Sequence, residues 1–268
     1  MEDYKKEIEN TRFGCVGSSD AAMLARIAHV GGVPKGALRR LAVVKGLAEN
    51  RPIPYTDAVR TGDEVEMAIY EMLHAVDERF QSNPCWTSIT YSRPNVTAID
   101  HPDIVLEDGE KKVLRVYEVK ASKFPLYSVR AEYMAQLYYH RLFAEEIVRR
   151  YGRPWRAEVY LVHYDTSGLD LSQPFSLDAK RLTVRKMRMG KTVFDLPQAM
   201  NIVNDFLATF DEYYDGDEIE SHYLPAPVRD EFEAMTQALA EIKERETRLA
   251  DFKNRRSEER RVGKECRS

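Results

Sequence analysis

Residues 101–121 have the sequence HPDIVLEDGEKKVLRVYEVKA, in which a turn signal separates two short apolar runs. The signal is Asp108-Gly109, a dipeptide favoured in tight hairpin turns because both residues tolerate positive φ. Two adjacent antiparallel strands would bring Asp103, at the head of the first run, close to Glu118 near the end of the second. Side chains alternate along a strand, so we expect Glu118 and Lys120 on the same face.

Two carboxylates beside an ammonium group suit the metal-dependent hydrolysis of phosphodiesters. The acids hold a hard divalent cation, Mg²⁺ with Mn²⁺ as a substitute, and the lysine orients the attacking water and offsets negative charge. Glu-x-Lys also occurs at 110–112 and 241–243, where a charged turn and a polar helix explain it as solvated surface. Only the pair at 118 and 120 lies in a β-type run, where a surface ion pair is the alternative.

The composition is that of an ordinary soluble protein: 268 residues, 43% hydrophobic and 31% charged, enough for one large core. No uncharged apolar run approaches the roughly 18 residues of a membrane span, and the N-terminus is too polar for a signal peptide. The scattered Cys15, Cys85 and Cys266 argue against a structural zinc, an iron–sulfur cluster or a disulfide framework. We expect a cytoplasmic protein with no membrane partner.

Charge is distributed unevenly along a chain whose net charge is −4. Residues 180–191 (KRLTVRKMRMGK) carry six basic groups and no acidic one, residues 149–156 (RRYGRPWR) add four arginines, and residues 211–220 are strongly acidic. A local basic groove is what a phosphate backbone requires, although solvated strand and helix faces also explain each basic run.

The pattern along the chain predicts one α/β (α+β) domain over residues 1–225, with a central mixed sheet flanked by helices. The expected helices are 19–30, 36–48, 57–80, 128–151 and 198–214; the expected strands are 86–91, 103–107, 113–121, 157–165 and 181–189. Residues 226–255 are expected to form an amphipathic C-terminal helix, which packs on its own domain or on a partner. Residues 256–268 (RSEERRVGKECRS) look like a translated sequencing adapter, with a genuine charged tail as the alternative.

The order of helix, three strands, helix and strand, with Asp103 heading the second strand and Glu118-Val119-Lys120 ending the third, resembles the PD-(D/E)XK nuclease superfamily. Asp100 is a nearby competitor for the aspartate. Gly62-x-x-x-Glu66, within TGDEVEMAIYEML (61–73), resembles the first motif of the YqaJ/lambda-exonuclease branch, with Glu64 as the alternative acid.

Two further motifs point to the same branch. Residues 133–139 (YMAQLYY) resemble the glutamine motif of RecB-like and YqaJ-like nucleases, which singles out Gln136; Tyr139 and His140 lie one turn on and would line the same groove. RFGCVGSSDAAML, which starts at Arg12, resembles the opening motif of YqaJ-type phage recombination exonucleases, in which an arginine and a serine seven residues later approach the DNA end. Arg12 and Ser19 have that separation, although Ser19 and Asp20 are equally suited to capping the first helix.

The resemblance implies a Mg²⁺-dependent DNA exonuclease that trims duplex ends in phage or mobile-element recombination. It implies that Asp103, Glu118 and the Val119 carbonyl bind the metal with help from Glu66, that Lys120 positions the water and that Gln136 supports it. Arg12, Ser19 and Tyr139 would contact DNA. The implied partners are double-stranded DNA ends, a single-strand annealing protein and further copies of this chain, as a trimer. The alternatives are a RecB-like or restriction-type endonuclease and a non-catalytic DNA-binding protein that retains the fold.

Overall fold

The structure is a computed structural model that describes residues 13–48, 55–123, 131–152, 154–188 and 192–210. These residues belong to one compact unit, Met1–Tyr214. Arg12, the expected helix over 226–255 and the tail over 256–268 lie outside the described residues. Within the described ranges, none of the helices combines the length and the apolar character needed to cross a bilayer.

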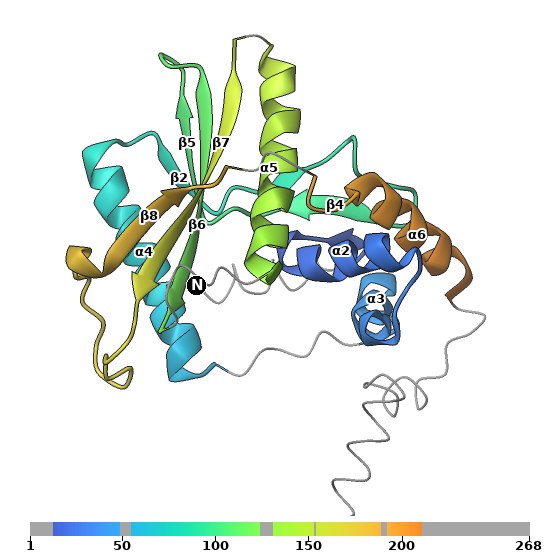
Figure 1. The fold of residues 1–268 in the computed structure, drawn as a ribbon, viewed down its shortest axis with the longest axis horizontal. Coiled ribbons are helices and arrows are strands. Elements are labelled where there is room, and N and C mark those ends of the chain that lie inside the picture. The colour runs from blue at the N-terminus through green and yellow to red at the C-terminus, as the bar shows by residue number, and fades with distance from the viewer. Residues whose placement is uncertain (1–12, 49–54, 124–130, 153, 189–191, 211–268) are drawn as a thin grey trace, which may run out of the picture. The chain divides into compact units, whose positions relative to one another are not determined.

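Two mixed sheets with helices packed around them form the fold, so the expected α/β class with a mixed central sheet is confirmed (Figure 1). The helices are α2 (Ala21–Val30), α3 (Leu38–Lys45), α4 (Asp57–Val76), α5 (Ala131–Tyr151) and α6 (Leu196–Thr209), with short 3-10 turns η1 (Ser18–Asp20), η2 (Lys35–Ala37) and η4 (Ala179–Arg181). The strands are β1 (Cys15–Val16), β2 (Phe80–Ser82), β3 (Trp86–Thr87), β4 (Thr97–Asp100), β5 (Ile104–Asp108), β6 (Val113–Ser122), β7 (Arg156–Asp165) and β8 (Leu182–Lys186).

The larger sheet has the strand order β2-β5-β6-β7-β8, with β6 at its centre. β5 and β6 are antiparallel, while β6 and β7 are parallel from Val113↔Arg156 to Ser122↔Asp165. Parallel neighbours need a crossover connection, and α5 supplies it. α4 and α5 lie on opposite sides of this sheet (Figure 1).

Strand alternation divides the core between the two faces of the larger sheet. On the α4 face, Val65 and Ile69 pack with side chains that include Ile104, Val119 and Val162. On the α5 face, Leu137 and Ala144 pack with side chains that include Leu114, Val116 and Leu161. Val119 therefore faces α4, and its neighbours Glu118 and Lys120 are directed to the side of α5.

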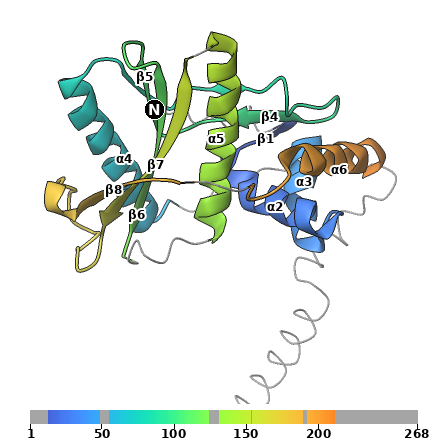
Figure 2. The same cartoon turned by 45° about the horizontal axis from the view of Figure 1, so that its top comes forward.

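The smaller sheet, β1-β4-β3, holds the N-terminal segment beside α5. β1 is parallel to β4, and β4 is antiparallel to β3 with Trp86 opposite Asp100. α2 packs against both α5 and α6, which places this helical group next to the α5 side of the molecule (Figure 2). The last residue of β4 thus lies close to the helix that covers the larger sheet.

Several elements expected from the sequence end earlier in the structure. The strand expected over 86–91 ends at Thr87, because the Ser88 hydroxyl accepts the Tyr91 amide at 2.8 Å and donates to Glu146 at 2.5 Å, which turns the chain. The helix expected over 57–80 ends at Val76, and its last expected residue, Phe80, begins β2.

The hairpin turn also differs from the tight turn expected at Asp108-Gly109. Asp108 is still paired with Val113, so the turn comprises the four residues 109–112. The Asp108 carboxylate accepts the Lys111 amide at 3.0 Å, and the positive φ, 52°, falls on Lys112. Asp108 therefore stabilises a longer turn from the end of the strand instead of occupying the bend itself.

Candidate active site

The β5–β6 hairpin brings Asp103 beside the end of β6, as the sequence predicts. Ile104 pairs with Tyr117, which places the residue before β5 next to Glu118 and Val119. The Val119 amide donates a hydrogen bond to Asp103 Oδ2 at 2.6 Å. Asp103 is thereby held at the same end of the sheet as Glu118, sixteen residues from its hydrogen-bond partner in sequence.

Glu118 and Lys120 lie on the same face of β6, and the Lys120 ammonium forms a close ion pair with Glu118 Oε1. The glutamate is buried and the lysine is partly exposed. Burial alone would lower the pKa of Lys120, but the carboxylates of Glu118 and Asp103 raise it above its usual value. Lys120 is therefore positively charged at neutral pH.

Glu66 reaches this site from α4. Its Oε1 accepts a hydrogen bond from Asn83 Nδ2 at 2.8 Å. Burial raises the pKa of Glu66, and the Glu118 carboxylate adds to the effect. Glu64, the alternative acid, instead forms an i,i+4 ion pair with Arg60 at 2.9 Å. Of the two candidate acids, Glu66 is the one whose pKa the Glu118 carboxylate raises.

The charges of the site fit a divalent cation. Burial, Glu118 and Glu66 raise the pKa of Asp103 well above its usual value, because negative charge is crowded in a poorly solvated place. Among the residues that the structure describes, no three His, Cys, Asp or Glu side chains form a ready-made metal cage. Mg²⁺ usually retains several waters and takes only one or two carboxylates, which Asp103 and Glu118 offer.

His140 of α5, expected with Tyr139 to line a groove, is instead fully buried between two carboxylates. Its Nε2 lies 2.8 Å from Glu118 Oε2, and its Nδ1 is hydrogen-bonded to Asp100 Oδ2 at 3.0 Å. Burial lowers the pKa of His140, but the two carboxylates outweigh burial and raise it to about 10. Asp100 is thus the partner of His140, while Asp103 holds the strand-start position.

Glu118 is consequently the best-satisfied acid of the site. Burial raises its pKa, yet Lys120 and His140 outweigh burial and bring the pKa down to about 2. One carboxylate oxygen faces the ammonium group and the other faces the imidazole. Glu118 remains ionised over the whole neutral range.

Gln136 lies on α5 one turn before His140 and is partly buried. In the described part of the chain it makes no hydrogen bond to Lys120 or to the three acids, so its supporting role stays a prediction. A different α5 side chain approaches the lysine: the Tyr133 ring centroid is 5.6 Å from Lys120 Nζ, within the range of a cation–π contact. No role was predicted for Tyr133 from the sequence.

The expectation that Tyr139 contacts DNA is wrong, because its side chain is fully buried. Its hydroxyl donates to the carbonyl oxygens of Val16, at 3.1 Å, and Ile99, at 3.0 Å. Tyr139 and His140 are consecutive on the helix and point into different parts of the interior. Tyr139 connects α5 to the smaller sheet, whereas His140 reaches the acids.

Ser19 is exposed on η1, beside the start of α2. Its neighbour Asp20 is buried and accepts the Gly17 amide at 3.0 Å while pairing with Arg40 at 2.7 Å. Of the two expected cap residues, Asp20 takes the N-cap position of α2, and Ser19 forms no side-chain cap hydrogen bond with η1 or α2. Its proposed role beside Arg12 at a DNA end stays a prediction.

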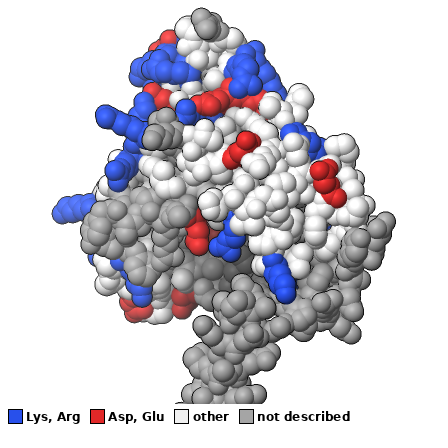
Figure 3. All heavy atoms as spheres, turned by 45° about the vertical axis from the view of Figure 1, so that its right-hand side comes forward, with Lys and Arg blue, Asp and Glu red and all other residues white. Residues whose placement is uncertain are grey.

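Three basic side chains of the two segments pair with acids where the structure describes them. Arg150 pairs with Glu146, and Arg156 and Lys186 pair with Glu158 at 3.4 and 2.6 Å. Figure 3 likewise shows basic side chains next to acidic ones near the top of the view. These three ion pairs support the interpretation of Arg150, Arg156 and Lys186 as charge-balanced surface.

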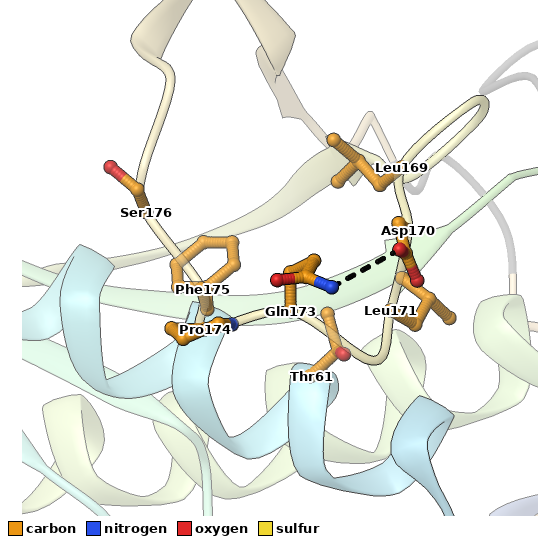
Figure 4. Close-up of a pocket in the computed structure, with 8 residues that line it drawn as sticks. All are labelled: Thr61, Leu169, Asp170, Leu171, Gln173, Pro174, Phe175 and Ser176. Atoms are coloured by element: carbon orange, nitrogen blue, oxygen red, sulfur yellow. Dashed lines mark hydrogen bonds between the residues drawn. The ribbon is translucent and has the colours of Figure 1, made fainter.

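A pocket of about 260 Å³ lies between α4 and the loop that follows β7 (Figure 4). It is lined by Thr61, Leu169, Asp170, Leu171, Gln173, Pro174, Phe175 and Ser176. Thr61 precedes Glu66 by five residues, or about 7.5 Å along a helix axis. None of the acids of the site lines this pocket, and its lining contains no basic side chain, so the pocket is poorly suited to phosphate.

Solved structures similar to this chain include an alkaline exonuclease, LHK-Exo, from Laribacter hongkongensis, with 13% identity over 78% of this chain and 95% of that chain and a TM-score of 0.48. They also include a proposed exonuclease from Eubacterium rectale, with 10% identity over 84% and 87% and a TM-score of 0.41. A third is SSO0001, with 9% identity over 76% and 78% and a TM-score of 0.39.

No protein-family model matches the chain, and no curated protein matches it either. Two of these three solved structures are described as exonucleases.

Proposed function

We propose that this protein is a Mg²⁺-dependent deoxyribonuclease that digests duplex DNA from its ends. The observation that carries the proposal is the juxtaposition of Asp103, Glu118 and Lys120 at one end of the β5–β6 hairpin. Two carboxylates that can share a cation, beside an ammonium group that can hold water, are the parts that phosphodiester hydrolysis needs.

Each residue of the site has a distinct task. Asp103 and Glu118 would hold Mg²⁺, with the Val119 carbonyl as a further oxygen and Glu66 acting directly or through water. The ion would polarise the scissile phosphate and lower the pKa of a bound water. Lys120 would orient the attacking water and offset the charge that develops on the phosphate, and Gln136 would support the lysine through its amide.

The substrate that we propose is a duplex DNA end. Arg12 offers a bidentate fork suited to a terminal phosphate, and Ser19 supplies an exposed hydroxyl seven residues later. Together they would bind a 5′-phosphate and draw the duplex forward after each cleavage. Such digestion leaves single strands, which suits a single-strand annealing partner in phage or mobile-element recombination, and a trimer that encloses the duplex would keep it bound.

Digestion of matched linear and covalently closed circular duplexes tests this function. With Mg²⁺ or Mn²⁺, linear DNA should disappear and circular DNA should persist, while EDTA should abolish cleavage. Cleavage of both substrates would favour a RecB-like or restriction-type endonuclease. Binding without cleavage, at any metal concentration, would identify a non-catalytic DNA-binding protein.

A further inference from the structure

A continuous buried chain of contacts leads from the smaller sheet to the acidic site. Asp100, His140 and Glu118 are each at most 1% exposed, and the two imidazole nitrogens face the two carboxylates at hydrogen-bonding distance. Asp100 ends β4, His140 lies on α5, and Glu118 belongs to β6. Three separate elements must be in place for this chain of contacts to exist.

The contacts leave His140 with a specific hydrogen-bonding task. A carboxylate can only accept hydrogen bonds, and an imidazole donates from both nitrogens only when it carries two protons. His140 with both protons can satisfy both buried carboxylates at once. Without it, Asp100 Oδ2 and Glu118 Oε2 would each lose this partner in a place that water does not reach, which is costly.

A buried ion network of this kind can serve the fold alone, since burial of charged groups often adds specificity more than stability. Here, however, the network ends on the site. His140 engages Glu118 Oε2, which leaves Oε1 as the oxygen beside Lys120, a lysine that also interacts with the charge of Asp103. An oxygen of a carboxylate has two lone pairs, so Oε1 can contact Lys120 and still accept a cation.

We propose that Asp100 and His140 form a positioning pair that fixes Glu118 as a one-oxygen ligand, with Oε1 facing the divalent cation. The proposal rests on the proposed function, and it assigns neither residue a contact with DNA. Partners that orient a metal ligand in this way commonly contribute 10- to 100-fold to metal affinity.

Direct Mn²⁺ binding to the DNA-free protein tests the pair, with the free ion measured by electron paramagnetic resonance. Asp100→Asn keeps the shape of the side chain and removes its charge, and His140→Gln keeps a single donor toward Glu118. We expect each variant to weaken Mn²⁺ binding about 10- to 100-fold. We also expect saturating Mn²⁺ to restore part of kcat, with the KM for DNA unchanged.

Glu146→Gln provides the matched control. Glu146 is also a buried carboxylate on α5, but it accepts hydrogen bonds from Ser88 and Ile89, away from the acids. Its replacement should lower the melting temperature without changing the Kd for Mn²⁺. A loss of affinity in this control equal to that in Asp100→Asn would show that general destabilisation is responsible and would overturn the proposal.

The possible failures are distinguishable. If wild-type protein binds Mn²⁺ and cleaves DNA while folded Asp100→Asn and His140→Gln bind Mn²⁺ equally well, the positioning pair is refuted and the proposed function stands. If wild-type protein binds no Mn²⁺, the proposed function is refuted, and the role of His140 fails with it. If His140→Gln does not fold, the isosteric Asp100→Asn decides the outcome.

Discussion

The carboxylate of Asp103 accepts the backbone amide of Val119 at 2.6 Å, so the acid that heads one strand is fixed to the strand that carries Glu118 and Lys120. This hydrogen bond lies beyond the last backbone pair of the hairpin, Ile104↔Tyr117. It positions one oxygen of Asp103 without using a residue from any other element. The position of Asp103 relative to β6 is therefore a local property of the hairpin.

Lys120→Ala should remove nearly all cleavage while the protein remains folded. Loss of the ammonium that orients water should cost several kcal/mol of transition-state stabilisation, on the order of 10³-fold in rate. Single-turnover digestion of linear duplex measures the loss. Lys186→Ala is the matched control and should cleave normally. It removes a lysine of β8 that pairs with Glu158 of β7. Substantial residual activity in Lys120→Ala would contradict its assigned role.

Glu66→Gln and Glu64→Gln should differ sharply, although the two residues are neighbours on α4. The Glu118 carboxylate raises the pKa of Glu66, so the two acids interact. Loss of Glu66 should raise the Mg²⁺ concentration needed for half-maximal cleavage roughly 10-fold or more, as expected for a group that supports a metal site. Glu64 forms an i,i+4 pair with Arg60, worth about 0.3–0.5 kcal/mol. Cleavage rates over a Mg²⁺ titration compare them, and equal behaviour would remove Glu66 from the site.

Tyr139→Phe should destabilise the fold without changing the affinity for DNA. The variant loses a buried hydroxyl that donates to the Val16 and Ile99 carbonyls, at a cost of about 1–2 kcal/mol in the free energy of unfolding. Urea unfolding measures this cost, and DNA affinity of the folded variant should match that of wild type. Weaker DNA binding with unchanged stability would instead make Tyr139 a DNA contact.

Acid should weaken the ion pairs around Glu158. Burial raises its pKa, but hydrogen bonds from Lys186 and Tyr160 outweigh burial and lower the pKa to about 2. Because the folded pKa lies below the unfolded value, the stabilisation is present above about pH 4.5 and is lost as the pH falls toward 2. The group is near the surface, so about 1 kcal/mol or less is expected. Urea unfolding at pH 5 and pH 3 should show a smaller difference in Glu158→Gln than in wild type.

Recognition of the duplex end should depend on Ser19, whereas the stability of the protein should not. We expect 5′-phosphorylated linear duplex to be digested faster than 5′-hydroxyl duplex, and Ser19→Ala to reduce that preference by up to about 10-fold, the effect of one charge-assisted hydrogen bond. Since Ser19 is exposed and caps no helix, the melting temperature should not change. If wild type treats both ends alike, Ser19 is an ordinary surface serine.

The sequence was sufficient to predict the hairpin and to predict that Glu118 and Lys120 share a face, because both follow from the two-residue period of a strand. It was insufficient for the partner of Glu118 on α5. His140 and Asp100 are forty residues apart, and their contact depends on how the smaller sheet packs against α5. The nearest sequence signal was the i,i+4 spacing of Gln136 and His140, which marks a shared helix face but not what that face touches.

Tyr139 illustrates the same limit of pattern-based inference. A run of aromatic residues on a helix predicts burial and groove lining equally well, and only the carbonyls of Val16 and Ile99 decide between them. The prediction of a tight turn at Asp108-Gly109 was wrong for a different reason. Asp108 has two possible roles in a turn, inside the bend or as a side-chain acceptor for a later amide, and the second prevails.

The central position of β6 has a consequence for how this protein can change over evolutionary time. The 109–112 turn lies at the opposite end of β5 from Asp103, about 17 Å away at the rise of a strand, so residues added there would lengthen a surface loop and leave the chemistry alone. One residue added between Arg115 and Tyr117 would reverse every side chain beyond it, exposing Val119 to α5 and turning Glu118 toward α4. Length variation in homologous chains should therefore be common at the turn and absent from the strand.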